Sequence, residues 1–280
     1  MDGLPVGSME ERRALDADRF SVLMAVILLG YALTPFIDIP ITGFVLQLPG
    51  AGFSFEVDFA TIVSLIVAGL AASGMLWLLQ GHPSIKGGAG FQHIILPATT
   101  AWAIGVTLNM LKAGPQWWVV LGLGSLLLGM VFWAEYVVVD LRDARHVPAS
   151  IGLIAVSYAL FLMLIIAVRA AEMRLYLEIP VGFLSAFVVC LRTLYLRLSG
   201  RWMFGWSFAI AMIAAQVALG LHYTPLLPIP FGIVLLGLVY ALVNLASGIE
   251  EERPWRTLWI EPLVMLVLLS ILTLVIVSGR

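Results

Sequence analysis

The sequence predicts an all-α integral membrane protein, built as a bundle of about nine transmembrane helices. Hydrophobic residues make up 61% of the 280 positions and charged residues only 11%, whereas about one-quarter of the residues in soluble domains are charged. The apolar residues also gather in runs of about 20, the length that crosses a bilayer as a helix. Because lipid lets apolar side chains cover the outside of a fold, both observations favour a membrane protein.

Residues 1–19 are polar and of mixed charge, and we expect this segment to lie in the cytoplasm. The first apolar run lacks a small-residue cleavage site, so it is predicted to be a retained span and not a signal peptide. Residues 20–280 are predicted to form a single polytopic transmembrane domain. Its apolar runs, separated by glycine, proline or charged residues, cover residues 20–38, 59–80, 92–111, 116–138, 150–170, 179–198, 203–222, 229–247 and 258–278.

The segment between the first two runs predicts a short β-hairpin on the outer membrane surface. From Phe53 to Asp58 apolar and polar residues alternate, which is typical of a strand. The turn-forming stretch 49–52 precedes this alternation, with residues 44–48 as the other strand. An irregular loop is the alternative.

The run at 92–111 is the most polar of the predicted spans, because it contains Pro97, Thr99, Thr100 and Asn109. A full span and a re-entrant segment both fit this composition. The re-entrant alternative would leave about eight spans.

The positions of Lys and Arg predict the orientation. Cytoplasmic loops of membrane proteins carry an excess of these residues. Most of them fall on the same side as the N-terminus, which predicts a cytoplasmic N-terminus, an outer C-terminus and an odd number of spans. That side has Arg12, Arg13, Arg19, Lys86, Arg142, Arg145, Arg197, Arg201, Arg253 and Arg256, and the other has Lys112, Arg169, Arg174 and Arg280.

Several classes of function are not expected. The net charge of −2 argues against a nucleic-acid partner. The single cysteine, Cys190, allows no internal disulfide. The four histidines, His82, His93, His146 and His222, lack the spacing of metal ligands on one helix face. We find no phosphate-binding loop, nucleophile elbow or other catalytic motif, and therefore predict no catalytic residues, metal or cofactor. Membrane lipids are the expected partners, with a homo-oligomer or a larger membrane complex as further options.

Ionisable residues inside the spans predict an inner polar pocket. A charge left in hydrocarbon costs about 2.5–3.5 kcal/mol unless it is paired or hydrated. Glu135, Arg192 and Glu261 lie toward the cytoplasmic ends of three spans, with Asn244 at similar depth. We expect Arg192 to pair with Glu135 or Glu261, either in a pocket that binds an ion, proton or lipid headgroup or as a static helix lock.

A second polar cluster is predicted at the outer ends of the spans. Its members are Asp38, Glu56, Asp58, Arg169, Glu172, Arg174, Glu178 and His222. A pocket lined by these residues would bind a polar solute or a sugar headgroup. Ordinary interfacial charges are the alternative, since water reaches such positions at little cost.

Two local patterns resemble known families. The string Glu251 to Arg256 resembles the two-glutamate motif of CAAX proteases and bacteriocin-processing proteins, but no histidine follows it to complete such a site. Residues 57–83 and 191–202, with Asp58-Phe59-Ala60, Gly81-His82-Pro83 and Arg192-Thr193-Leu194-Tyr195, resemble a family of multi-span bacterial proteins of unknown function. That resemblance implies a bacterial cytoplasmic membrane and supplies no activity.

We therefore expect a non-enzymatic membrane protein, either a carrier for a small or lipidic solute or a subunit of a membrane complex. Gly-Met-Val-Phe at 129–132 lines up with Gly-Leu-Val-Tyr at 237–240, as in the internal repeats of transporters. The alternative is an intramembrane enzyme for a lipid-linked substrate, with Glu56, Asp58 and His222 as acid and base.

Overall fold

The computed structural model describes residues 16–37, 42–48, 51–57, 59–80, 90–140, 143–171, 175–198 and 200–278. Close contacts divide the chain into two compact units, Met1–Ala149 (unit 1) and Ser150–Arg280 (unit 2). Each unit is described by itself.

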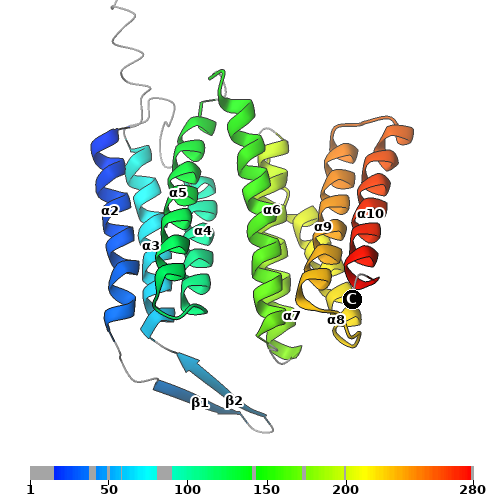
Figure 1. The fold of residues 1–280 in the computed structure, drawn as a ribbon. Helices are drawn as coiled ribbons and strands as arrows, with labels where there is room; N and C mark the ends of the chain where they lie inside the picture. Colours follow the sequence, from blue (N-terminus) through cyan, green and yellow to red (C-terminus); the bar gives the residue numbers. More distant parts are fainter. Residues whose placement is uncertain are drawn as a thin grey trace, which may run out of the picture. The chain divides into compact units, whose positions relative to one another are not determined.

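Unit 1 contains four long helices, which stand side by side in Figure 1. The polar Asp16 begins the first of them, because its side chain accepts hydrogen bonds from the backbone N–H groups of Asp18 and Arg19. The helices are α2 (Ala17–Leu33, followed by the 3-10 turn η1, Thr34–Phe36), α3 (Phe59–Leu79), α4 (Phe91–Asn109) and α5 (Pro115–Val138).

Two strands, β1 (Thr42–Leu48) and β2 (Ala51–Val57), lie between η1 and α3. They pair antiparallel, with Phe44 opposite Phe55 and Leu46 opposite Phe53. The pair occupies the segment where the alternating sequence predicts a hairpin. Its position on a membrane surface stays a prediction.

Close packing of α3 against α4 organises the core of unit 1. A Cβ atom at Gly105 would lie 2.5 Å from Cβ and 3.2 Å from the Cα atom of Ser64, so glycine is needed for the two helices to approach this closely. Both Ala101 and Thr100 are fully buried. Part of the polarity of α4, at His93 and Thr100, therefore lies in enclosed positions, whereas Asn109 at the end of the helix is exposed.

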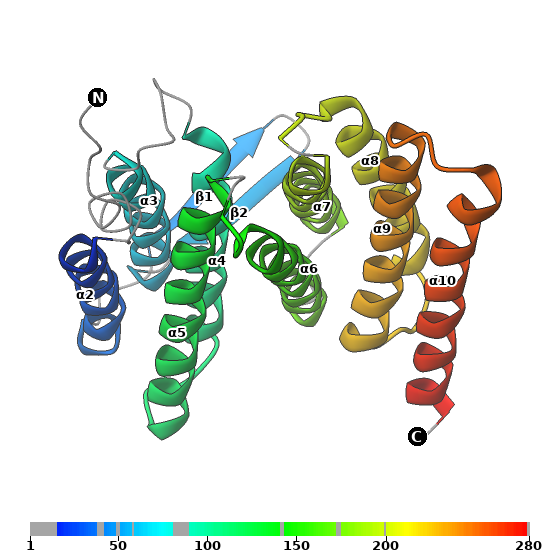
Figure 2. The ribbon, with the colours of Figure 1, turned by 90° about the horizontal axis from the view of Figure 1, so that it is seen from above.

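Unit 2 contains α6 (His146–Ala170, from Ser150 onward), α7 (Leu175–Arg197), α8 (Phe204–His222), α9 (Pro228–Glu250) and α10 (Trp255–Ser278). Viewed from above, α9 lies between α8 and α10 (Figure 2). Small residues such as Ala186, Ala211 and Ala214 are buried in its core, which lets α7 and α8 pack closely.

All nine long helices of the described residues coincide with predicted runs, with ends that differ by a few residues. Seven of them are long and apolar enough to cross a membrane: α2 extended to Phe36, α3, α5, α6, α7, α8 and α9. The polar α4 is not among the seven, and in α10 an apolar stretch is found over Leu258–Leu269. Within the described residues, the fold is thus a helical bundle compatible with a membrane.

Candidate functional site

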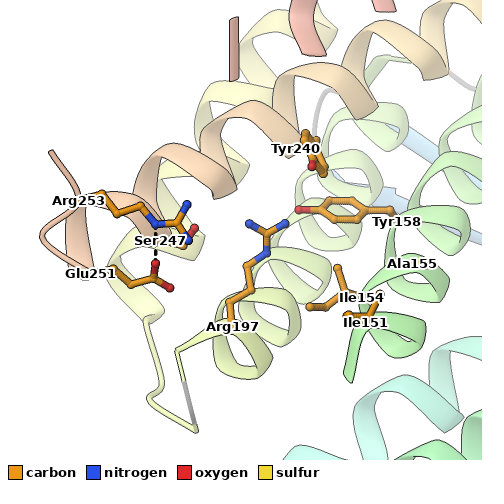
Figure 3. Close-up of a pocket in the computed structure, with 9 residues that line it drawn as sticks. All are labelled: Ile151, Ile154, Ala155, Tyr158, Arg197, Tyr240, Ser247, Glu251 and Arg253. Atoms are coloured by element: carbon orange, nitrogen blue, oxygen red, sulfur yellow. Dashed lines mark hydrogen bonds and ion pairs between the residues drawn. The ribbon is translucent and has the colours of Figure 1, made fainter. Parts of the chain in front are cut away.

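A cavity of about 450 Å³ opens within unit 2, at the end where α7 and α9 finish. We call it the Arg197 cavity. Figure 3 shows its lining, which comes from four segments: α6, the end of α7, the second half of α9 and the turn after α9. The lining residues are Ile151, Ile154, Ala155, Tyr158, Arg197, Tyr240, Ser247, Glu251 and Arg253.

Arg197 supplies to this cavity a positive charge that forms no ion pair among the described residues. Its guanidinium group donates a hydrogen bond to Oδ1 of Asn244 and lies 5.8 Å from the ring centre of Tyr240. The ion pairs of the described residues at this end join Arg201 to Glu250 and Arg253 to Glu251 and Glu261, and none includes Arg197. A neutral amide and an aromatic face hold the cation without cancelling its charge.

Two buried donors lie beside Arg197 without hydrogen-bond partners among the described residues. They are the hydroxyl group of Tyr158 and the side-chain nitrogen of Asn244. The two residues are 8% and 5% exposed, and Figure 3 shows the hydroxyl end of Tyr158 turned toward the guanidinium group of Arg197. Of the two residues, Tyr158 lines the cavity, and its hydroxyl group also interacts with the side chain of Thr193. Because a buried polar group without a partner costs about 1–3 kcal/mol, a ligand oxygen that accepts a hydrogen bond from Tyr158 would be favoured.

The rim of the cavity carries an ion pair between Glu251 and Arg253, with Oε2 and Nε 2.7 Å apart. Both residues lie in the tight turn that ends α9. In this turn the N–H of Arg253 donates to the carbonyl of Gly248, and Glu252 adopts a left-handed backbone conformation with φ of 53°. Glycine usually occupies this position in a helix-ending turn of this type.

Part of the α6 wall of the cavity is apolar. It is formed by Ile151, Ile154 and Ala155, on the first turns of α6 that belong to unit 2. In Figure 3 these side chains face the stem of Arg197 from the α6 side. The Arg197 cavity therefore combines a cation and the hydroxyl group of Tyr158 with hydrocarbon from α6, a pattern that suits an anionic amphiphile.

The structure places the predicted inner-pocket residues in both units. Glu135 belongs to unit 1, where it is fully buried with Oε2 2.8 Å from Nδ1 of His93. Arg192 belongs to unit 2, is 1% exposed and lies 5.5 Å from the ring of Tyr195. Because the two residues lie in different units, their pairing stays a prediction. Glu261 is exposed and lies 3.8 Å from Arg253.

Three members of the predicted outer cluster meet in unit 2. Oε2 of Glu178 lies 2.6 Å from Nδ1 of His222 and 3.7 Å from Nη1 of Arg169. Arg169 also donates to the carbonyls of His222 and Thr224. These contacts satisfy much of the donor capacity of Arg169 within the protein, and so favour a structural role for the three residues.

The other members of that cluster cannot be placed at a site. Asp38, Asp58, Glu172 and Arg174 lie outside the described residues, and only the backbone of Glu56 is described. The acid–base hypothesis that joins Glu56 and Asp58 to His222 therefore stays untested. Among the described residues, no group of three or more His, Cys, Asp or Glu side chains is arranged to hold a metal ion.

Sequence reasoning does not bring the residues of the Arg197 cavity together. Arg197 is interpreted only as a loop charge that fixes topology, Tyr240 is named only in the repeat alignment, and Tyr158 is not named. The sequence does contain a usable signal. Tyr158 and Tyr240 each lie in an apolar run, in the half of that run that is nearer to a loop containing arginine. A hydroxyl group at that depth needs a polar partner.

Fold and site together define a class, namely a mainly helical protein with seven membrane-compatible helices among its described residues and a cationic cavity at one end of unit 2. The chain belongs to the DUF5656 family, described as proteins of unknown function, whose family model matches residues 39–276. This result agrees with the expected resemblance to a family of unknown function. Comparison with curated proteins and with solved structures finds no match.

Proposed function

We propose that this chain is a non-catalytic membrane protein that binds an anionic amphiphile in the Arg197 cavity, as a carrier or as a lipid-holding subunit of a membrane complex. One observation carries the proposal: Arg197, which forms no ion pair among the described residues, and the buried hydroxyl of Tyr158 line a cavity that also has an apolar part. A carboxylate or phosphate oxygen would accept hydrogen bonds from Arg197 and Tyr158.

The size and lining of the cavity support an amphiphile over a small free anion. A volume of about 450 Å³ exceeds the space that a hydrated inorganic anion needs and falls in the range of organic ligand sites. Ile151 and Ile154 would contact the first methylene groups of an acyl chain. Each buried methylene group contributes about 0.8 kcal/mol.

The setting that we propose is the cytoplasmic membrane of a bacterium, with the N-terminus in the cytoplasm. The arginine-rich loops after α5, α7 and α9 support this orientation. The Arg197 cavity would then open toward the inner leaflet, at the level of lipid headgroups.

Lipid binding to the purified full chain tests the proposal. Native mass spectrometry in detergent would compare phosphatidylglycerol, which is anionic, with zwitterionic phosphatidylcholine. We expect a clear preference for phosphatidylglycerol, and we expect Arg197→Gln to weaken that binding about tenfold or more, because a charge-assisted hydrogen bond is lost.

Arg201→Gln is the matched control, because Arg201 lies at the same end of unit 2 but outside the cavity lining. The control should bind phosphatidylglycerol as the wild type does. Arg197→Lys, which keeps the charge, should retain part of the affinity if Arg197→Gln weakens the fold. Equal binding of both lipids, or equal losses in the two glutamine variants, would contradict the proposal.

A further inference from the structure

We infer that Glu251 sets the charge of the headgroup that the Arg197 cavity accepts, so that the site selects an amphiphile with a single negative charge. This inference rests on the proposed function. It assigns the class of ligand, a carboxylate or phosphodiester headgroup as opposed to a phosphate monoester, and names the residue that makes the distinction.

The charges of the lining residues support a monoanionic ligand. The cavity contains two guanidinium groups, on Arg197 and Arg253, and one carboxylate, on Glu251. The 2.7 Å contact between Glu251 and Arg253 occupies the second guanidinium group, which leaves the charge of Arg197 for a ligand. A phosphate monoester carries about −1.5 to −2 at pH 7 and would exceed this single available charge.

The position of Glu251 also makes it a repulsive element. Its side chain is 35% exposed at the rim of the cavity, where a headgroup with excess negative charge would meet it. Specific sites commonly combine an attractive contact with such a like-charge element against the wrong ligand. Here Arg197 attracts the anion and Glu251 limits its charge.

The backbone holds Glu251 and Arg253 in this arrangement. The turn after α9 is closed by hydrogen bonds from the N–H groups of Glu252 and Arg253 to carbonyls of the last turn of the helix. Glu252 occupies the left-handed position of this turn, at a conformational cost that glycine would avoid. Residues held in such conformations concentrate at functional sites.

Substitution of Glu251 by glutamine tests the inference, because it should change which of two lipids the protein binds more tightly. The probes are phosphatidylglycerol, a phosphodiester, and phosphatidic acid, a phosphate monoester, each titrated onto the full-length chain at pH 8. Wild type should bind phosphatidylglycerol at least as tightly as phosphatidic acid. In Glu251→Gln, Arg253 keeps only its longer, 3.8 Å ion pair with Glu261 and the negative charge at the rim is removed, so the preference should shift toward phosphatidic acid by about fivefold.

Glu252→Gln is the matched control, because it removes the same charge one residue away, outside the cavity lining. It should leave the preference of the wild type unchanged. An unchanged preference in Glu251→Gln, or an equal shift in both glutamine variants, would overturn the inference. Either result would leave the proposed function standing if Arg197→Gln still weakens phosphatidylglycerol binding. If Arg197→Gln binds phosphatidylglycerol as the wild type does, both the proposed function and this inference are contradicted.

Discussion

Two buried carboxylates, Glu135 and Glu178, each lie within hydrogen-bond distance of a histidine on a neighbouring helix. Glu135 is fully buried and Glu178 is 4% exposed. Ionised groups at such depth require partners, since an isolated charge in apolar surroundings is far too costly. Each pair therefore joins two helices, α4 to α5 in unit 1 and α7 to α8 in unit 2.

His93→Ala should destabilise unit 1, because it removes a hydrogen-bond partner from the fully buried carboxylate of Glu135. We expect the free energy of unfolding to fall by about 2–4 kcal/mol. Thermal unfolding in detergent would detect the change. His146→Ala is the control, because Nδ1 of His146 has no hydrogen-bond partner among the described residues. Equal losses in the two variants would show that the pair with Glu135 contributes nothing specific.

The charged residues of the spans could be predicted from the sequence, but their partners could not. A glutamate in an apolar run reveals that a partner must exist. It does not reveal that the partner is His93, which lies 42 residues earlier in the chain. Arg197 shows the same limit, because a charge near a span end fits a topology signal and a ligand contact equally well.

At the scale of the helices, glycine decides which pairs approach most closely. Gly105→Ala should lower the free energy of unfolding by about 1–3 kcal/mol, because the new methyl group would overlap Ser64 and force α3 and α4 apart. The midpoint of unfolding in detergent measures the effect.

Gly69→Ala provides the comparison for that substitution. A Cβ atom at Gly69 meets no atom within 4 Å, so this variant should change the stability by less than about 0.5 kcal/mol. Similar effects of the two substitutions would contradict the packing that we describe for α3 and α4.

The helices themselves were predictable because bilayer thickness imposes a length that can be read from composition. Helix ends were less predictable. The observed α6 begins at His146, four residues before the predicted start, and α9 ends at Glu250, three residues after the predicted end. Polar residues at these ends can continue a helix into the headgroup region, where hydropathy gives no signal.

At the scale of the whole chain, the two units build their helix cores in the same order. In unit 1 α3 packs on α4 and α4 on α5, and in unit 2 α7 packs on α8 and α8 on α9. At the aligned positions of the proposed repeat, Phe132 is fully buried in the core of unit 1, whereas Tyr240 lines the Arg197 cavity. The repeat stays a prediction, and the two aligned aromatic residues differ in their surroundings.

Cysteine labelling tests the predicted topology and the polar helix α4 together. In a Cys190→Ala background, Gln80→Cys and Lys112→Cys flank α4. If α4 spans the membrane, a membrane-impermeant maleimide should reach the two positions from opposite sides. Labelling of both from the same side would favour the re-entrant alternative. Labelling of Glu252→Cys from the same side as Gln80→Cys would support the predicted orientation.

The turn that ends α9 has a consequence for how a ligand enters. Residues 251–254 alone connect α9 to α10, and hydrogen bonds close the first part of this connector onto the helix. A connection this short does not allow the turn to move away from the cavity as a mobile loop would. Entry past Glu251 would instead follow a fixed portal, so the rate of lipid exchange should depend on the width of the acyl chain and headgroup and hardly on loop motion.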